Sequence, residues 1–474
     1  MAQKIVSVNG TTYEVLEKYD KLKKKNVPFM LGKGGQGAAF KAKNTKTGEL
    51  CALKMYHAKT PPAFNDNLKK LAQNGSPHEA FVWPEELLPA RSNGAIGFTM
   101  ELYDGEVYKK FKDIAIFSKY QFASRRVQLN ALIELASAFE ALHAKGYCFQ
   151  DINEGAIVFD VKNGRVRICD CENVAPEGSR IPMGYSSDGK EIFIQGFPRY
   201  KAPEVEIRAT LPDKYTDRYS LAVMMFMVLT CCHPLEGKKR FTYNSEGIVD
   251  ANVEKDIYGK NPIYIFDTNN STNRPDPIED KDALRLWPEI PQFVKDLFQQ
   301  AFTAGMPSKG MYDEAKRQAR YNRPSEKQWR EAFIKWMDLL VTCEKCGHSF
   351  AAELNPTTMQ LSTVCPSPKC GHNNNFQVPR MKVYKRVAHR RTVLLVPERE
   401  IPLSAISESN SFEPALLVLK GKVPGVFGVK NLTDKVWNCT LGRSSVTLAK
   451  NEFVQIKNGM KIAFDYDFSV EIIM

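Results

Sequence analysis

The chain has 474 residues, of which 43% are hydrophobic and 25% charged, and its formal net charge is +12. This composition excludes a largely disordered chain, a collagen-like chain and a coiled-coil rod, and the length allows about three domains of roughly 150 residues. No apolar run reaches the ~18 residues of a membrane span, and the N-terminus lacks the apolar core of a signal peptide, so we expect a soluble cytoplasmic protein. The positive charge favours acidic partners, such as a phosphoprotein, an acidic protein surface or nucleic acid.

Hydrophobic periodicity divides the first part of the chain into two regions. From about Glu14 to Leu102, short β-type runs alternate with glycine turns, and one helix is predicted at Asn65–Gln73. From Phe117 to about Leu340 the helical period dominates. A small β lobe before a mostly helical lobe indicates an α+β arrangement. The clearest predicted helices of the second region are Gln128–Ala144, Ser220–Cys232, Pro291–Ala304 and Glu326–Leu340.

Residues 341–378 form a polar, cysteine-rich segment. Cys343-x-x-Cys346 is followed, after 18 intervening residues, by Cys365-x-x-x-x-Cys370. Two cysteine pairs, each on a turn, can bring four thiolates around one Zn²⁺ at about 2.3 Å, with no position left open for substrate. The spacing therefore predicts a Cys₄ zinc ribbon with structural Zn²⁺. The other seven cysteines lie in apolar contexts, as expected of buried thiols in a reducing compartment.

Residues 379–474 return to β-type runs separated by turn signals, which is typical of a small β-sandwich. The segment from Leu441 onward faintly resembles a forkhead-associated domain, although the phosphothreonine-reading Ser-x-x-His is not evident. The stretch Pro379–Arg391 holds six Lys or Arg residues and no acid, and Lys18–Lys25 holds five lysines. We interpret both basic runs as solvated faces of the protein, and we prefer this interpretation to nucleic-acid-binding patches.

A glycine-rich segment near the N-terminus, Leu31–Gly37, contains G-x-G-x-x-G. Glycines let the backbone approach a polyphosphate and turn its N–H groups toward the oxygens. A dinucleotide fold would continue into a helix, but here a β-type run follows. Seventeen residues after the last glycine, Lys54 stands on a second β-type run, where its charge suits phosphates; the alternative is a surface lysine. The candidate phosphate-binding residues are Gly32, Gly34, Gly35, Gly37 and Lys54.

The glycine hairpin followed by Ala52-Leu53-Lys54 resembles the eukaryotic-like (Hanks-type) protein kinases. The resemblance implies a bilobal kinase-like domain over residues 13–340, with an N-lobe at 13–102 and a C-lobe at 103–340. It also implies ATP as a cofactor, with Lys54 on its α- and β-phosphates and Ala52 as a further cofactor-binding residue. Met100–Tyr103 resembles the hinge, so the backbone of Glu101 and Tyr103 is expected to bind the adenine edge.

Two catalytic segments follow in the family's order. His143–Asp151 resembles the run into the catalytic loop, and the resemblance makes Asp151 the base that orients the substrate hydroxyl and accepts its proton. Nineteen residues later, Asp170 of the sequence Asp-Cys-Glu stands where D-F-G is expected, so the family assigns it to Mg²⁺ and to ATP.

Two structural landmarks complete the resemblance. Gly196–Glu204 resembles the segment that ends in A-P-E, whose Glu the family pairs with a late Arg, here Arg323. Asp217, which opens an apolar helix, resembles the family's buried anchoring Asp. Six landmarks in one order over some 300 residues make coincidence a poor explanation.

The sequence departs from the family pattern at positions that take part in metal binding and catalysis. Ala156 replaces the Asn that binds a second Mg²⁺, and Asn153, the nearest amide and a candidate cofactor-binding residue, comes three residues early. The predicted helix at Asn65–Gln73 holds no Glu to pair with Lys54, and the nearest carboxylates, Asp66 and Glu79, leave its partner open. The catalytic-loop His and Arg are replaced by Phe149 and Gln150.

The whole order of kinase, zinc ribbon and β module resembles bacterial kinases of the tellurite-resistance-associated phosphorylation triad. That resemblance implies a von Willebrand-type protein and a metal-dependent phosphatase as partners beside the protein substrate. The leading hypothesis is an ATP- and Mg²⁺-dependent serine/threonine protein kinase whose activity is weak. The alternatives are a nucleotide-binding pseudokinase scaffold that recruits partners through its zinc and β modules, and a nucleic-acid-associated module built on the zinc ribbon and the basic run after it.

Overall fold

The computed structural model describes residues 3–194, 196–243, 251–306, 318–353, 361–376, 378–409, 413–465 and 467–474. The chain forms two compact units, Met1–Trp287 with Gln292–Arg330, and Pro288–Pro291 with Glu331–Met474. No helix within the described ranges has the length and apolar character needed to cross a membrane.

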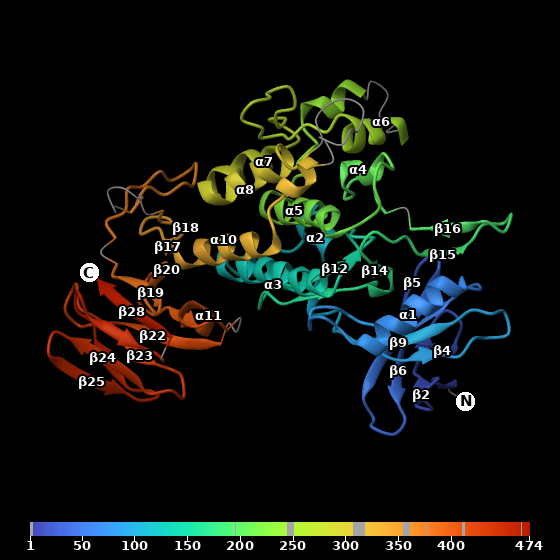
Figure 1. Cartoon of the computed structure of the whole chain (residues 1–474), viewed down its shortest axis with the longest axis horizontal. Coiled ribbons are helices and arrows are strands. Elements are labelled where there is room, and N and C mark those ends of the chain that lie inside the picture. Colours follow the sequence, from blue (N-terminus) through green and yellow to red (C-terminus); the bar gives the residue numbers. More distant parts are fainter. Residues whose placement is uncertain are drawn as a thin grey trace. The chain divides into compact units, whose positions relative to one another are not determined.

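The first unit begins with a seven-stranded sheet, drawn in blue in Figure 1. Its antiparallel centre pairs the strand after the glycine loop with the lysine strand, so that Ala39 lies opposite Lys54, and the lysine strand pairs in turn with the hinge strand. The strand order is β1 (Lys4–Val6), β2 (Thr12–Val15), β6 (Gly37–Asn44), β7 (Leu50–Tyr56), β9 (Gly97–Glu101) and β8 (Leu87–Leu88), with β5 (Met30–Lys33) paired to β6.

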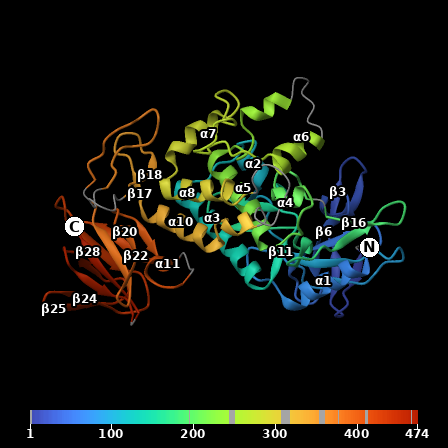
Figure 2. The ribbon, with the colours of Figure 1, turned by 45° about the horizontal axis from the view of Figure 1, so that its top comes forward.

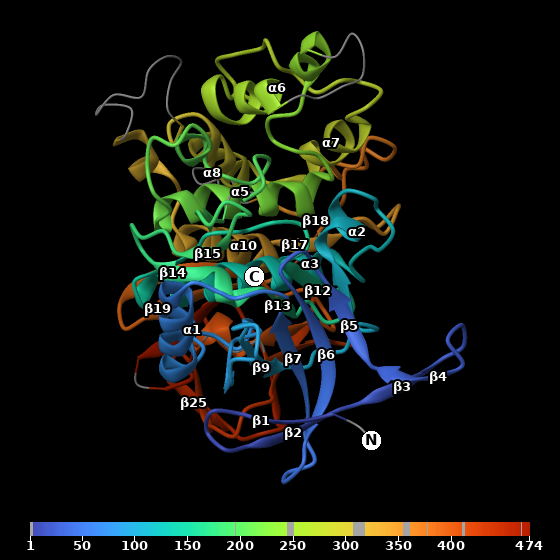
Figure 3. The ribbon, with the colours of Figure 1, turned by 90° about the vertical axis from the view of Figure 1, so that its right-hand side faces the viewer.

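The helix predicted at Asn65–Gln73 is confirmed as α1 (Pro62–Asn74). It begins three residues earlier than predicted because Pro62 occupies its first position, where no N–H is needed. Its buried face, which includes Phe64 and Leu68, packs with Phe98 of the hinge strand. The first lysine run forms a separate hairpin of β3 (Glu17–Asp20) and β4 (Lys25–Pro28), which Figure 3 shows projecting from the sheet.

The helical part of the first unit is built around α5 (Lys214–Thr230), whose residues are buried on nearly every side. A helix that is apolar all round belongs in a core, and Figure 2 shows α5 among α3 (Arg125–Ala144) and α8 (Gln292–Phe302). The predicted helices are confirmed, although α5 starts six residues earlier because Asp213 caps it and forms a reciprocal capping box with Thr216. The shorter helices are α2 (Phe111–Ala115), α4 (Pro203–Glu206), α6 (Ala251–Lys255) and α7 (Lys281–Leu286).

Short strands place the catalytic segments next to one another. The strand before Asp151 pairs with the strand after Glu172, with Phe149 opposite Val174. Another antiparallel pair flanks Ala156 and Cys169, whose backbones share a hydrogen bond of 2.7 Å. These strands are β11 (Tyr147–Phe149) with β14 (Val174–Pro176), β10 (Tyr108–Lys110) with β12 (Ile157–Asp160) and β13 (Val166–Ile168), and the hairpin of β15 (Pro182–Tyr185) and β16 (Glu191–Phe193).

The second unit contains the end of α10 (Glu326–Asp338), the hairpin of β17 (Leu340–Thr342) and β18 (Ser349–Ala351), and two larger sheets. One sheet has the order β20 (Ala388–Leu394), β19 (Arg380–Lys385), β28 (Phe468–Ile473), β27 (Lys461–Ala463), β24 (Trp437–Leu441), β25 (Ser444–Leu448). The other has the order β21 (Glu400–Pro402), β22 (Pro414–Lys420), β23 (Phe427–Asn431), β26 (Phe453–Gln455), and α11 (Leu403–Ile406) follows β21.

The two larger sheets share one hydrophobic core, to which Val383 and Trp437 of one sheet and Val418 of the other contribute. In β19 the alternate residues Met381 and Val383 face this core, as expected of a strand with one buried face. The second basic run lies on β19 and β20. Three of its residues form ion pairs, Lys385 with Glu408, Arg386 with Asp467, and Arg391 with Asp338.

Candidate active site and metal centre

The glycine loop joins β5 to β6, and the space around its glycines differs from one to the next. A Cβ on Gly37 would lie 2.6 Å from the carbonyl oxygen of Met55, so the close approach of β7 demands glycine there. A Cβ on Gly32 or Gly35 would meet no atom within 4 Å. The loop is closed by the Gly34 N–H, which donates to the Gly37 carbonyl oxygen at 2.9 Å. Open space at Gly32 and Gly35 is compatible with a bound polyphosphate.

Lys54 lies on the central strand β7 and reaches two carboxylates. Its Nζ is 2.7 Å from Oδ1 of Asp170, and it also forms an ion pair with Glu172. The partner that the sequence left open is therefore Glu172, two residues after Asp170. Asp66 is exposed on α1, and Glu79 pairs instead with Arg165 at 2.7 Å. Although burial opposes the charged form, the carboxylates of Glu172 and Asp170 raise the pKa of Lys54.

Asp170 is held by an unusual backbone conformation. Its φ of 58° and ψ of 37° are left-handed, a region that non-glycine residues seldom enter and that is found at functional sites. The side chain of Asp170 is 42% exposed, whereas that of Glu172 is 3% exposed. Carboxylate oxygens are the ligands that Mg²⁺ prefers, and an accessible one beside a lysine fits a metal-bound phosphate. The residues present therefore fit ATP with Mg²⁺.

The candidate catalytic loop is held in shape by the amide side chain of Asn153. Asn153, which is 8% exposed, donates from Nδ2 to the Asp151 carbonyl oxygen at 2.8 Å and accepts at Oδ1 from the Gly155 N–H at 2.8 Å. The amide of Asn153 thus holds the loop itself. Ala156 is fully buried and offers no side-chain ligand.

Asp151 lies in the same loop, with the Asn173 amide nitrogen 3.5 Å from its Oδ2. Burial, with a contribution from the nearby Asp170 carboxylate, raises the pKa of Asp151 to about 6. A carboxylate with a pKa near neutrality is suited to accepting a proton. Structure thus brings Asp151, Lys54 and Asp170, three residues from separate parts of the sequence, into one electrostatically linked group.

Two buried ion pairs brace the loop and the segment that follows it. Asp217 accepts hydrogen bonds from the Phe149 N–H at 2.6 Å and from His143 Nε2 at 3.0 Å. Arg323 and Glu204 form the predicted pair, which is bidentate with N–O distances of 2.6 and 2.8 Å and has no exposed side-chain surface. These landmarks of the resemblance are confirmed as contacts.

The segment between Asp170 and Glu204 is tied to the candidate catalytic loop by hydrogen bonds, one of which runs from the Tyr200 hydroxyl to the Glu154 carboxylate at 2.9 Å. Gln150 donates from Nε2 to the Ser179 carbonyl oxygen at 2.8 Å. Ile181, at the edge of β15, packs on the cluster that contains Phe64 and Leu68 of α1. The segment therefore contacts both the loop and the helix.

The candidate hinge, Met100–Tyr103, begins on the last two residues of β9. Met100 lies opposite Ala52 in the sheet register, and Glu101 lies opposite Cys51. The carboxylate of Glu101 accepts from Arg167 Nη2 at 3.2 Å, and the Tyr103 ring packs edge-on against Tyr108 with centroids 5.8 Å apart. Because both side chains contact neighbouring residues, the backbone is the part of the candidate hinge that is suited to an adenine edge.

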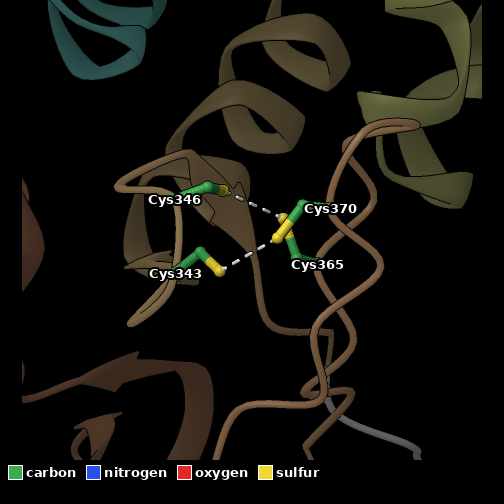
Figure 4. A group of neighbouring side chains, drawn as sticks. All are labelled: Cys343, Cys346, Cys365 and Cys370. Atoms are coloured by element: carbon green, nitrogen blue, oxygen red, sulfur yellow. Dashed lines mark hydrogen bonds between the residues drawn. The ribbon is translucent and has the colours of Figure 1, made fainter.

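The second unit carries the predicted cysteine cluster, shown in Figure 4. Cys343 and Cys370 have Sγ atoms 3.8 Å apart, as do Cys346 and Cys365, and all four Sγ atoms lie within 4.8 Å of one another. Four sulfurs at about 2.3 Å from a tetrahedrally bound Zn²⁺ would be about 3.8 Å apart. The geometry of the thiols therefore fits the ion that the spacing predicts.

The backbone around the cysteines is shaped for a metal. Gly347 and Gly371 follow Cys346 and Cys370 with φ values of 71° and 55°, which permit the tight turns. The buried Asn374 links the two turns, because it accepts from the Glu344 N–H at 2.8 Å and donates to the Thr363 carbonyl oxygen at 2.7 Å. Although burial opposes the charged form of the Cys343 thiol, the backbone N–H groups of Cys346 and Lys345 lower its pKa, whereas burial raises the pKa of Cys365.

Sequence reasoning did not find the contacts of two contributors to the candidate site. Glu172 replaces the Gly of D-F-G, and that departure was the signal that could have indicated its contact with Lys54. His143 was quoted only as part of the run into the loop, although it contacts Asp217 directly. Both roles depend on contacts across more than 70 residues of sequence.

Comparison with known proteins identifies the family to which the chain belongs. The family model "Protein kinase domain" matches residues 26–304, which is more than half of the chain. The chain is 26% identical over 228 residues to CBL-interacting serine/threonine-protein kinase 1 of Arabidopsis thaliana, covering 47% of this chain and 48% of that protein. It is 26% identical over 249 residues to a probable serine/threonine-protein kinase of Dictyostelium discoideum, covering 51% of this chain and 44% of that protein. The chain thus spans about half the length of these curated relatives. On the family match and the order of its contacts, the chain belongs to the protein kinase family.

Proposed function

We propose that the protein is an ATP- and Mg²⁺-dependent serine/threonine protein kinase. The observation that carries the proposal is the 2.7 Å contact between Lys54 Nζ and Asp170 Oδ1, because it unites the candidate phosphate-binding cation with the candidate metal ligand. Mg²⁺ bound at Asp170 would neutralise charge on the transferring phosphoryl group. Lys54 would hold the α- and β-phosphates, and Asp151 would orient the substrate hydroxyl and accept its proton.

We infer that transfer is slow compared with a family member that has both metal ligands. Ala156 is buried and supplies no oxygen to a second Mg²⁺, and the amide of Asn153 is used within the loop. Charge that develops on the γ-phosphoryl is then neutralised less fully in the transition state. The glycine loop, Lys54 and Asp170 remain for nucleotide binding.

The experiment is transfer of labelled γ-phosphate from ATP to the protein itself and to a generic protein substrate, with Mg²⁺. Asp151→Asn keeps the shape of the side chain and should abolish transfer while ATP binding is retained. Glu79→Gln, which alters an exposed surface pair, is the matched control and should transfer as the parent does. A parent that binds ATP but never transfers phosphate would favour a nucleotide-binding scaffold instead.

The second unit is proposed to be a zinc ribbon at 341–378 followed by a β-sandwich module at 379–474, which recruits partners. Support comes from the converging cysteines and from the core shared by two sheets. By resemblance of the whole domain order to bacterial triad kinases, the proposed partners are a von Willebrand-type protein and a metal-dependent phosphatase. A cytoplasmic location is proposed because ATP is required and because thiols persist in reducing compartments.

A further inference from the structure

Lys54 is anchored by an unexpected segment of the chain. Its ammonium contacts Asp170 and Glu172, which lie at the two ends of a three-residue stretch. Asp170 is in the left-handed conformation, and Cys171–Asn173 form a single 3-10 turn directly after it. This change of direction brings both carboxylates to the same atom, Nζ of Lys54.

The helix that packs beside this site supplies no carboxylate to the lysine. The buried face of α1 consists of Phe64, Asn67, Leu68 and Leu71, and its one acidic residue, Asp66, is exposed. Instead, Asn67 donates from Nδ2 to the carbonyl oxygen of Val174 at 2.8 Å. A neutral hydrogen bond thus connects α1 to the chain two residues beyond Glu172.

The two carboxylates differ in a way that separates their roles. The side chain of Glu172 is 3% exposed, whereas that of Asp170 is 42% exposed. A buried carboxylate is costly unless it is paired, and Lys54 is the cation that Glu172 contacts. If Asp170 turns toward a metal, Glu172 still holds the ammonium. The exposed acid is therefore suited to the metal and the buried acid to the lysine.

We propose that Glu172 is a positioning residue that holds Lys54 in place for the nucleotide phosphates. The Asp170–Glu172 stretch then sets both the metal ligand and the phosphate-binding cation, so the position of the lysine follows this stretch and does not depend on a charge from α1. The proposal deepens the proposed kinase function and rests on it for its catalytic consequence. The ion pair itself is testable without any phosphoryl transfer.

The first readout is the rate at which an amine-selective acylating reagent modifies Lys54, measured by mass spectrometry at one fixed pH in the full-length protein. The side chain of Lys54 is only 17% exposed and its ammonium is held between two carboxylates, so it should react slowly in the parent. Glu172→Gln keeps a buried polar group of the same shape but removes the charge. Modification of Lys54 should then accelerate severalfold, because the amine loses the buried partner that holds it. Glu172→Asp should behave more nearly like the parent, and Glu79→Gln should match it.

The second readout is the kinetics of γ-phosphate transfer against ATP and Mg²⁺ concentration. Glu172→Gln should lower kcat/KM for ATP at least about tenfold with an unchanged Mg²⁺ requirement, because a mobile lysine binds phosphates less well in the transition state. Two results would overturn the proposal: an unchanged rate of Lys54 modification in Glu172→Gln, or a changed Mg²⁺ requirement with an unchanged rate, which would make Glu172 a metal ligand. If Glu172→Gln fails to fold, Glu172→Asp decides by the same two readouts. A parent with no transfer, but a faster Lys54 modification in the variant, defeats the kinase function and leaves the anchoring role standing.

Discussion

The backbone N–H of Phe149 donates to Oδ2 of Asp217 at 2.6 Å, across 68 residues of sequence. Asp217 is 2% exposed and lies in the first turn of the buried helix α5. Since a buried carboxylate must be paired, this bond fixes the chain two residues before Asp151 to the buried helix α5. The same carboxylate oxygen accepts from His143, whose other ring nitrogen is 3.0 Å from Glu326. The candidate base therefore rests on a buried charge network.

The network predicts loss of stability at alkaline pH. Burial opposes the imidazolium, but hydrogen bonds to Asp217 and Glu326 raise the pKa of His143 to about 9. Because the folded-state pKa lies above the unfolded value of about 6.5, the stabilisation is complete below pH ~6.5 and is lost as pH rises through about 9. The shift corresponds to up to about 3 kcal/mol. Melting temperatures of the parent and His143→Gln, measured from pH 6 to 10, should converge as the pH rises; parallel curves would contradict this role.

The Arg323–Glu204 pair is predicted to be essential for folding of the first unit. Both side chains are fully buried, so Arg323→Ala leaves an unpaired carboxylate and should cost about 3–5 kcal/mol of unfolding free energy. The matched control is Arg285→Ala, because Arg285 pairs with Asp282 at the surface, where such a pair contributes about 0–1 kcal/mol. Urea unfolding of the full chain checks both. If the two variants lost similar amounts of unfolding free energy, the buried pair would not stabilise the fold more than a surface pair does.

The charged form of Asp151 is predicted to lower the folding stability of the protein, although phosphate transfer requires it. Burial raises the pKa of Asp151 to about 6, so its charge becomes unfavourable in the folded state as pH rises from about 4 to 6. At pH 7, Asp151→Asn should raise the melting temperature and abolish transfer. In the parent, kcat/KM should fall about tenfold per pH unit below pH ~6, where the base is protonated. A variant that is inactive and also less stable would mark Asp151 as a structural residue.

The cysteine cluster is predicted to bind one zinc per chain. Cys343→Ser should lower the zinc content measured by atomic emission and destabilise the second unit, because the four thiolates are its metal cross-link. His372→Ala is the matched control, since the hydrogen bond that links His372 to the cluster among the described residues uses its backbone carbonyl oxygen, which accepts from the Cys365 N–H at 2.8 Å. Chelation should lower the melting temperature of the parent to that of Cys343→Ser. A metal-free parent with the same melting temperature would falsify the zinc assignment.

Local pattern was sufficient for much of this protein. The period of apolar residues predicted α1, α3, α5, α8 and α10, because burying one face of a helix repeats every three to four residues. The spacing of Cys343, Cys346, Cys365 and Cys370 predicted the cluster, because each pair needs only one turn to converge. The order of motifs predicted the kinase family. In each case the signal lay within about 30 residues of contiguous sequence, or in the order of such segments.

Tertiary structure alone decided which charged groups meet. Glu172 pairs with Lys54 across 118 residues, and His143 meets Asp217 across 74, so no local period encodes either contact. The first basic run became a separate hairpin, and the second became two adjacent strands whose basic residues pair with acids distant in sequence. A charged residue in the sequence indicates only that its side chain will need an oppositely charged partner if it is buried. Which partner it finds depends on how strands and helices pack, because electrostatic pairing acts through space and not along the chain.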